Sequence, residues 1–182
     1  GGIIFMKTPL LYQLSEFDCG PITLYNALKY LFDRDEISYE VIKEIMNITL
    51  DKKEKGTSKE AMKKSSLSLK KYLPLNVLIY EGNAVTPEII RENNDPKTVF
   101  ILRTKLCCEH YVLITNFKKN YYLWDPYYLN YKIYQKKEVK IYLNKPLYNR
   151  VISKDYFESF SFTDFTLGPL SKRQLIIFKR QD

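Results

Sequence analysis

A cysteine at the predicted start of a helix, Cys19, is the residue of this sequence best placed to act as a nucleophile. In Asp18-Cys19-Gly20-Pro21, the aspartate can cap a helix and the proline fits its first turn. Unpaired N–H groups and the helix dipole at such an end favour negative charge. Because the thiolate is the reactive form, Cys19 is a candidate for attack on a carbonyl carbon, although a buried core cysteine fits the same position.

The only histidine of the chain, His110, is the candidate base for this thiol. It opens the apolar run Tyr111–Ile114, which we expect to be a buried strand. A cysteine nucleophile needs an adjacent base, and imidazole suits that role near neutral pH. The sequence therefore favours a Cys–His pair.

Asp125 is the candidate that would orient the histidine ring. A two-residue turn at Lys118-Lys119 would place His110 opposite Tyr127 in an antiparallel hairpin. Asp125 lies two residues from Tyr127, so it would project on the same face as His110. A carboxylate there would fix the tautomer of the imidazole. An aspartate before a proline is also a common turn signal, and that interpretation stays open.

Gln13 completes the candidate site, six residues before Cys19. Its side-chain amide could donate to an oxyanion that develops on the substrate, together with the backbone N–H of Cys19. A lone glutamine would carry no information, so this role depends on the other three residues.

These residues lie in segments that resemble the bacteriocin-processing cysteine peptidases, the double-glycine-leader peptidase domains of many bacterial ABC exporters. The opening motif of that family resembles Gln13–Pro21, and its middle segment resembles Gly56–Ser58. Its His-Tyr-Val-Leu-Ile and Trp-Asp-Pro motifs match His110–Ile114 and Trp124–Pro126. The resemblance spans roughly residues 7 to 133. One departure is Tyr127 and the residues after it, where the family commonly has a glycine.

The resemblance implies a papain-like fold in a standalone member of this family. It implies Cys19 as nucleophile, His110 as base, Asp125 as orienting residue and Gln13 as oxyanion donor. It also implies a peptide substrate, such as a leader ending in Gly-Gly, an association with an exporter, and no cofactor.

The order of the predicted elements favours an α+β fold with a mostly antiparallel sheet, because helices come first and strands later. We expect a helix from Asp18 that Asp33–Glu36 ends, and further helices at Ser38–Met46, Gly56–Tyr72 and Pro87–Asn93. We expect strands at Leu75–Tyr80, Thr98–Leu102, His110–Asn116, Tyr121–Asp125, within Tyr127–Ile141, and at Leu175–Phe178.

The 182 residues predict one domain, 1–182. Within it, 146–182 is a C-terminal extension whose role the sequence does not define, and its aromatic stretch Phe157–Phe165 is expected to pack on the body. Gly1–Met6 is expected to be a cloning remnant or a stretch upstream of Met6. With three cysteines, no signal peptide and no membrane-spanning run, we expect a reduced, cytoplasmic protein.

The net charge of +8 does not identify a partner. We interpret the lysine runs Lys52–Lys55, Lys63–Lys71 and Lys118-Lys119 as solvated surface and expect no nucleic-acid partner. We also expect no metal site, because Cys107 and Cys108 would point to opposite faces of a strand.

Two further functions remain open. A papain-like acyl or peptidyl transferase, such as phytochelatin synthase, shares the Cys-Gly-Pro helix start with a later His and Asp. A binding module on the same scaffold would leave Cys19 with the reactivity of an ordinary thiol.

Overall fold

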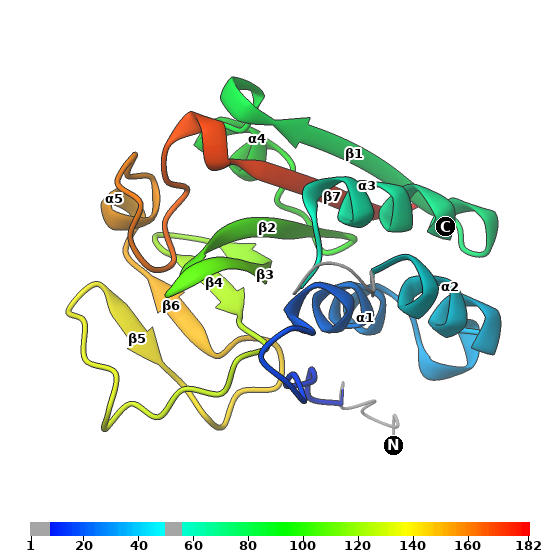
Figure 1. Ribbon diagram of the computed structural model, residues 1–182, viewed down its shortest axis with the longest axis horizontal. Helices are drawn as coiled ribbons and strands as arrows, with labels where there is room; N and C mark the ends of the chain where they lie inside the picture. The colour runs from blue at the N-terminus through cyan, green and yellow to red at the C-terminus, as the bar shows by residue number, and fades with distance from the viewer. Residues whose placement is uncertain (1–7, 50–55) are drawn as a thin grey trace, which may run out of the picture.

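A computed structural model describes residues 8–49 and 56–182 of the chain. The expectations for Gly1–Met6 and for the lysine run Lys52–Lys55 lie outside these residues. The fold is α+β with an antiparallel sheet, as the sequence predicted. The sheet has seven strands, and helices lie on both of its faces (Figure 1). In the part of the chain that the structure describes, no helix is long and apolar enough to cross a membrane.

The helices form close to where the apolar periodicity and the turn residues place them. Ser58 caps α3 by accepting a hydrogen bond from the amide of Ala61, and Thr86 caps α4 through the amide of Ile89. The helices are α1 (Cys19–Leu31), α2 (Tyr39–Thr49), α3 (Lys59–Ser68), α4 (Pro87–Glu92) and α5 (Lys154–Phe157). Short 3-10 turns are η1 (Arg34–Glu36), η2 (Leu69–Lys71), η3 (Gly82–Ala84) and η4 (Leu170–Lys172).

The strands occur in the sheet in the order β1-β7-β2-β3-β4-β6-β5. They are β1 (Leu75–Glu81), β2 (Thr98–Leu106), β3 (Cys108–Phe117), β4 (Tyr121–Trp124), β5 (Val139–Ile141), β6 (Arg150–Ile152) and β7 (Gln174–Arg180). The region 127–141 forms only the three-residue β5, so most of it is loop.

The segment 146–182 supplies two strands, β6 and β7, to the interior of the sheet. β7 pairs with β1 on one side and with β2 on the other. The aromatic stretch before it is divided between core and surface, because Phe157 and Phe165 are fully buried whereas Phe160 and Phe162 are exposed. The last strand in chain order therefore joins the first strand to the rest of the sheet.

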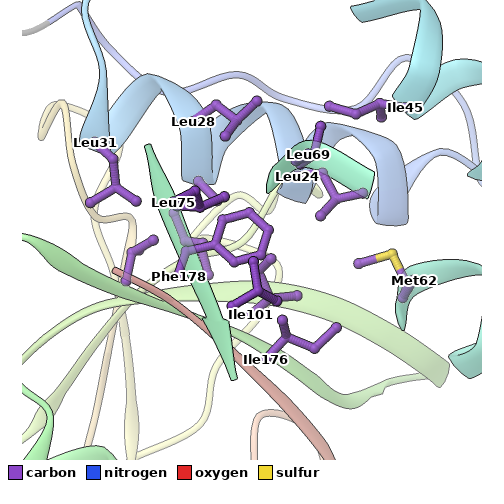
Figure 2. Close-up of a cluster of buried hydrophobic side chains, with 14 of the residues drawn as sticks. Leu24, Leu28, Leu31, Ile45, Met62, Leu69, Leu75, Ile101, Ile176 and Phe178 are labelled. Carbon is purple, nitrogen blue, oxygen red and sulfur yellow. The ribbon is translucent and has the colours of Figure 1, made fainter. Parts of the chain in front are cut away.

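The larger core lies between the sheet and α1, α2 and α3 (Figure 2). Leu24, Leu28 and Leu31 follow at helical spacing on α1 and face this core. Alternate residues of β7, Ile176 and Phe178, meet them from the sheet. This packing fixes α1, and therefore its N-terminus, against the sheet.

Candidate active site

The N-terminus of α1 places Cys19 at the edge of the core. α1 begins at Cys19, and 8% of this residue is exposed. Gly20 lies so close to Thr57 that a Cβ atom on Gly20 would be 2.4 Å from the Thr57 hydroxyl oxygen. Only a glycine permits this approach, so the Cys-Gly pair brings the residues before α3 next to the thiol.

Asp18 does not cap α1 through its side chain, which corrects the expectation from the sequence. It occupies the N-cap position, but its carboxylate makes no hydrogen bond to the first turn of the helix. The carboxylate instead accepts from the amides of Leu14 and Ser15, both at 2.8 Å, and from the Ser15 hydroxyl at 2.9 Å. Asp18 therefore folds the preceding loop back on itself and orders the residues after Gln13.

The loop that carries Gln13 is tied to both α1 and β4. Asn26 of α1 exchanges two hydrogen bonds with the backbone of Leu11, and the indole N–H of Trp124 donates to the Leu11 carbonyl. The amide of Gln13 donates to the carbonyl of Pro126 at 2.8 Å, directly after Asp125. These bonds hold the backbone of Gln13 near the candidate orienting carboxylate.

The side chain of Gln13 is oriented by its own loop. Its Nε2 donates to the carbonyl oxygen of Ser15 at 2.6 Å, and its Oε1 is buried with no hydrogen-bond partner among the described residues. An amide nitrogen has two N–H donors, so one remains for a ligand.

The β3–β4 hairpin has the predicted register near the site, although its turn differs from the predicted one. The turn has three residues rather than two, so Phe117 pairs with Tyr121. A β-bulge at Thr115 then removes the one-residue offset, and Leu113 pairs with Trp124. The expected turn is therefore wrong, but the bulge restores the alignment that the sequence predicted for the end of the hairpin.

The structure brings together the side chains of Cys19, His110 and Asp125. His110 Nε2 lies 2.6 Å from Asp125 Oδ1, and both residues are buried. The Cys19 side chain is also close enough to the imidazole to raise its pKa, through hydrogen bonding and charge. Because Nε2 is taken up by the carboxylate, Nδ1 is the ring nitrogen left to interact with the thiol.

The electrostatic balance at His110 favours the imidazolium. Burial alone would lower its pKa, but the charge and hydrogen bond of Asp125, followed by those of Cys19, raise the pKa from 6.5 to about 10. His110 is therefore protonated at neutral pH.

Asp125 has further partners that sequence reasoning missed. Its Oδ1 also accepts from the amide of Tyr127 at 2.9 Å, and its Oδ2 lies 3.3 Å from Nη2 of Arg150. Asn149 exchanges two hydrogen bonds of 2.7 Å with the Asp125 backbone. The one sequence signal for the pairing of Asp125 with Arg150 is that a charged residue, Arg150, directly precedes the apolar Val151 in β6.

A groove of about 900 Å³ lies beside Cys19, which is large enough for several residues of an extended peptide. Acidic and basic side chains both line it. Tyr111 forms part of the wall, and its hydroxyl donates to Gln174 of β7 at 2.8 Å. Burial raises the pKa of Tyr111, so this hydroxyl stays neutral. The lining includes Phe17, Cys19, Thr57, Arg103, Cys108 and Tyr111.

The other two cysteines are at the β2–β3 turn. Both Cys107 and Cys108 are exposed free thiols, and Cys107 has a positive φ of 63° because it forms the turn itself. Cys107 is therefore not in a strand, and the expectation of opposite strand faces does not describe it. Among residues 8–49 and 56–182, no cluster of three His, Cys, Asp or Glu side chains could hold a metal ion.

Among known proteins, similarity to this chain is found in solved structures. No protein-family model matches the chain, and no curated protein sequence matches it significantly. Among solved structures, the crystal structure of the peptidase domain of Streptococcus mutans ComA is similar, with 12% sequence identity and a TM-score of 0.47. The alignment covers 92% of this chain and 97% of that domain. At this level, the likeness concerns the arrangement of the backbone alone.

Proposed function

We propose that this protein is a papain-like cysteine peptidase that cleaves a peptide bond through an acyl-thioester intermediate. One observation carries the proposal: the His110 imidazole lies 2.6 Å from the Asp125 carboxylate and close enough to Cys19 for the thiol to act on its pKa, inside a buried site that opens beside a groove. A helix start, a raised histidine pKa and an orienting carboxylate are the conditions that a thiolate–imidazolium pair needs.

The reaction follows from these positions. The Cys19 thiolate attacks the carbonyl carbon and forms a C–S bond, and the resulting oxyanion accepts hydrogen bonds from the Cys19 backbone N–H and the free N–H of Gln13. The C–N bond then breaks while the His110 imidazolium gives its proton to the leaving amine. Water, deprotonated by His110, attacks the thioester, and cleavage of the C–S bond restores the thiolate.

The substrate class that fits this proposal is a peptide with small residues at the cleavage point, such as a leader ending in Gly-Gly. The motifs around Cys19 and His110 resemble the double-glycine-leader peptidases, and an exporter would be the partner that receives the processed peptide. Acyl transfer to an amine uses the same thioester, so the second nucleophile decides between hydrolysis and transfer.

Mass spectrometry of the products tests the proposal. The wild-type protein is incubated with peptides encoded beside its gene, with and without an added amine. We expect hydrolysis products from the wild-type protein and none from Cys19→Ala or His110→Ala. Full cleavage by Cys19→Ala would sink the proposal, and amine adducts in place of acids would reassign the protein as an acyltransferase.

A further inference from the structure

A fully buried arginine lies behind the candidate triad. Arg150, the first residue of β6, has no exposed surface, and its Nη2 lies 3.3 Å from Oδ2 of Asp125. The same Nη2 donates to the carbonyl of Tyr127 at 2.8 Å, and Nη1 donates to the carbonyl of Asn149 at 2.9 Å. The guanidinium is therefore bound by the backbone carbonyls of Tyr127 and Asn149 as well as by the carboxylate of Asp125.

Burial of this cation needs an explanation, because a buried charge is costly unless it is paired. Asp125 is the acidic side chain paired with Arg150, and it shares its other oxygen with His110. The face of Phe165 lies 5.7 Å from the guanidinium carbon and adds a weak cation–π contact. The cation therefore has a buried carboxylate as its counterion, and that carboxylate also faces the proposed base.

We infer that Arg150 is a positioning residue of the site, which orients Asp125 and balances its charge so that the Cys19–His110 ion pair forms in the neutral pH range. This inference rests on the proposed function. In the proposed arrangement, the charges of the Cys19 thiolate, the His110 imidazolium, the Asp125 carboxylate and the Arg150 guanidinium alternate in sign, and their sum is zero. Removal of Arg150 would leave two anions to share one imidazolium.

The sign of the effect follows from the groups that surround the site. Loss of the cation makes the potential at His110 more negative, so the imidazolium is held to higher pH and the thiolate forms at higher pH. The charged or titratable groups that act on His110 are Asp125 and Cys19, and those that act on Arg150 are Asp125, Tyr12 and Tyr134. Tyr111 lines the groove beside Cys19, and the charges of Arg103, Cys19 and Glu81 act on it. Besides Arg150 and His110 itself, the positively charged side chain among these groups is Arg103, and it acts on Tyr111 rather than on Asp125.

The test compares Arg150→Met and Arg150→Gln with the wild-type protein. His110 is the only histidine, so a single imidazole NMR signal reports its titration. Site-resolved mass spectrometry gives the rate of iodoacetamide alkylation of Cys19 against pH and separates it from Cys107 and Cys108. We expect both midpoints to move up by about one pH unit in the variants.

Arg173→Met is the matched control. Arg173 is also buried, at 2% exposure, but it donates to the backbone carbonyls of Gly168 and Val85. Its loss removes a buried guanidinium of the structure without changing the charge behind Asp125, so both midpoints should stay at the wild-type values.

Folded Arg150→Gln with unshifted midpoints would overturn the inference and leave Arg150 a structural residue. Arg150→Lys, which keeps the charge, covers the case in which the neutral variants do not fold. In Arg150→Lys, the midpoints of the His110 titration and of Cys19 alkylation should match those of the wild type. An upward shift of about one pH unit in this variant would also overturn the inference. The histidine titration needs no substrate, so its result is separate from failure of the peptidase assay.

Discussion

The backbone of Gly20 lies against the side chain of Thr57, with only 2.4 Å between the position of an added Cβ and the Thr57 hydroxyl oxygen. We expect Gly20→Ala to lower the free energy of unfolding by about 1–3 kcal/mol, as overpacking of a tight contact does. It should also slow alkylation of Cys19, because α1 or the segment before α3 must move.

Urea denaturation and alkylation kinetics check this prediction. Because the Thr57 Cβ is itself 2.6 Å from the added atom, Thr57→Gly rather than Thr57→Ala is the partner that relieves the clash. Gly20→Ala should therefore cost less stability in the Thr57→Gly background than in the wild type. A Gly20→Ala protein as stable as the wild type would contradict the contact.

Asp18 provides a second prediction, about the loop rather than the helix. In Asp18→Ala, the amides of Leu14 and Ser15 lose their acceptor and should exchange hydrogen faster, whereas the amides of α1 should not. Hydrolysis should weaken as well, since this loop orients Gln13. Ser15→Ala is the milder control, because it removes the hydroxyl that donates to Asp18 and accepts from the Phe17 amide but keeps the Asp18 carboxylate. Faster exchange in the first turn of α1 would mean that Asp18 caps the helix after all.

Asp125→Asn should reduce kcat strongly, and it also removes the carboxylate that pairs with the buried Arg150. An amide in place of the carboxylate no longer stabilises the imidazolium and can select the wrong tautomer, which costs about 10⁴ in kcat in serine hydrolases with the same arrangement. Steady-state kinetics on a cleaved peptide measure the effect. The exposed Asp155→Asn on α5 changes the same charge at the surface and should leave kcat unaltered. Comparable kcat values for the two variants would remove Asp125 from the mechanism.

The raised pKa of His110 predicts how stability depends on pH. Because the folded protein holds the proton more tightly than the unfolded chain, this group stabilises the fold fully below pH 6.5, and the contribution is lost as the pH rises through about 10. The free energy of unfolding of the wild type should therefore fall over this range relative to His110→Gln. If the free energy of unfolding depends on pH in the same way in both proteins, the pKa of His110 is not raised.

The Cys19 contact contributes to that raised pKa, which gives a separate prediction. Cys19→Ala removes the hydrogen bond and the charge of the thiol, so the pKa of His110 should fall below its wild-type value. The single histidine signal in NMR measures it directly. An unchanged titration would mean that the thiol and the imidazole do not interact in solution.

Local patterns predicted the elements but not all of their connections. Helical spacing on α1 and the apolar runs of β3 and β4 are local signals, so the sequence located Cys19, His110 and Asp125 on elements that do meet. The bulge at Thr115 is not a local signal, because it depends on a three-residue turn that the lysine pair did not reveal.

The buried ion pair escaped prediction for another reason. Arg150 and Asp125 are separated by 25 positions and meet only because β4 pairs with β6. No periodicity within either strand specifies that pairing. The direction of the Asp18 hydrogen bonds was missed for a related reason, since an aspartate before a helix can serve either the helix or the loop that precedes it.

The position of β7 has a consequence for the timing of synthesis. This strand is the last in chain order, yet it lies between β1 and β2, and its Gln174 accepts the hydrogen bond of Tyr111 in the groove wall. A nascent chain still attached to the ribosome before β7 emerges lacks the strand that joins the two parts of the sheet. We therefore expect Cys19 and His110 to reach their final arrangement only after translation has passed β7.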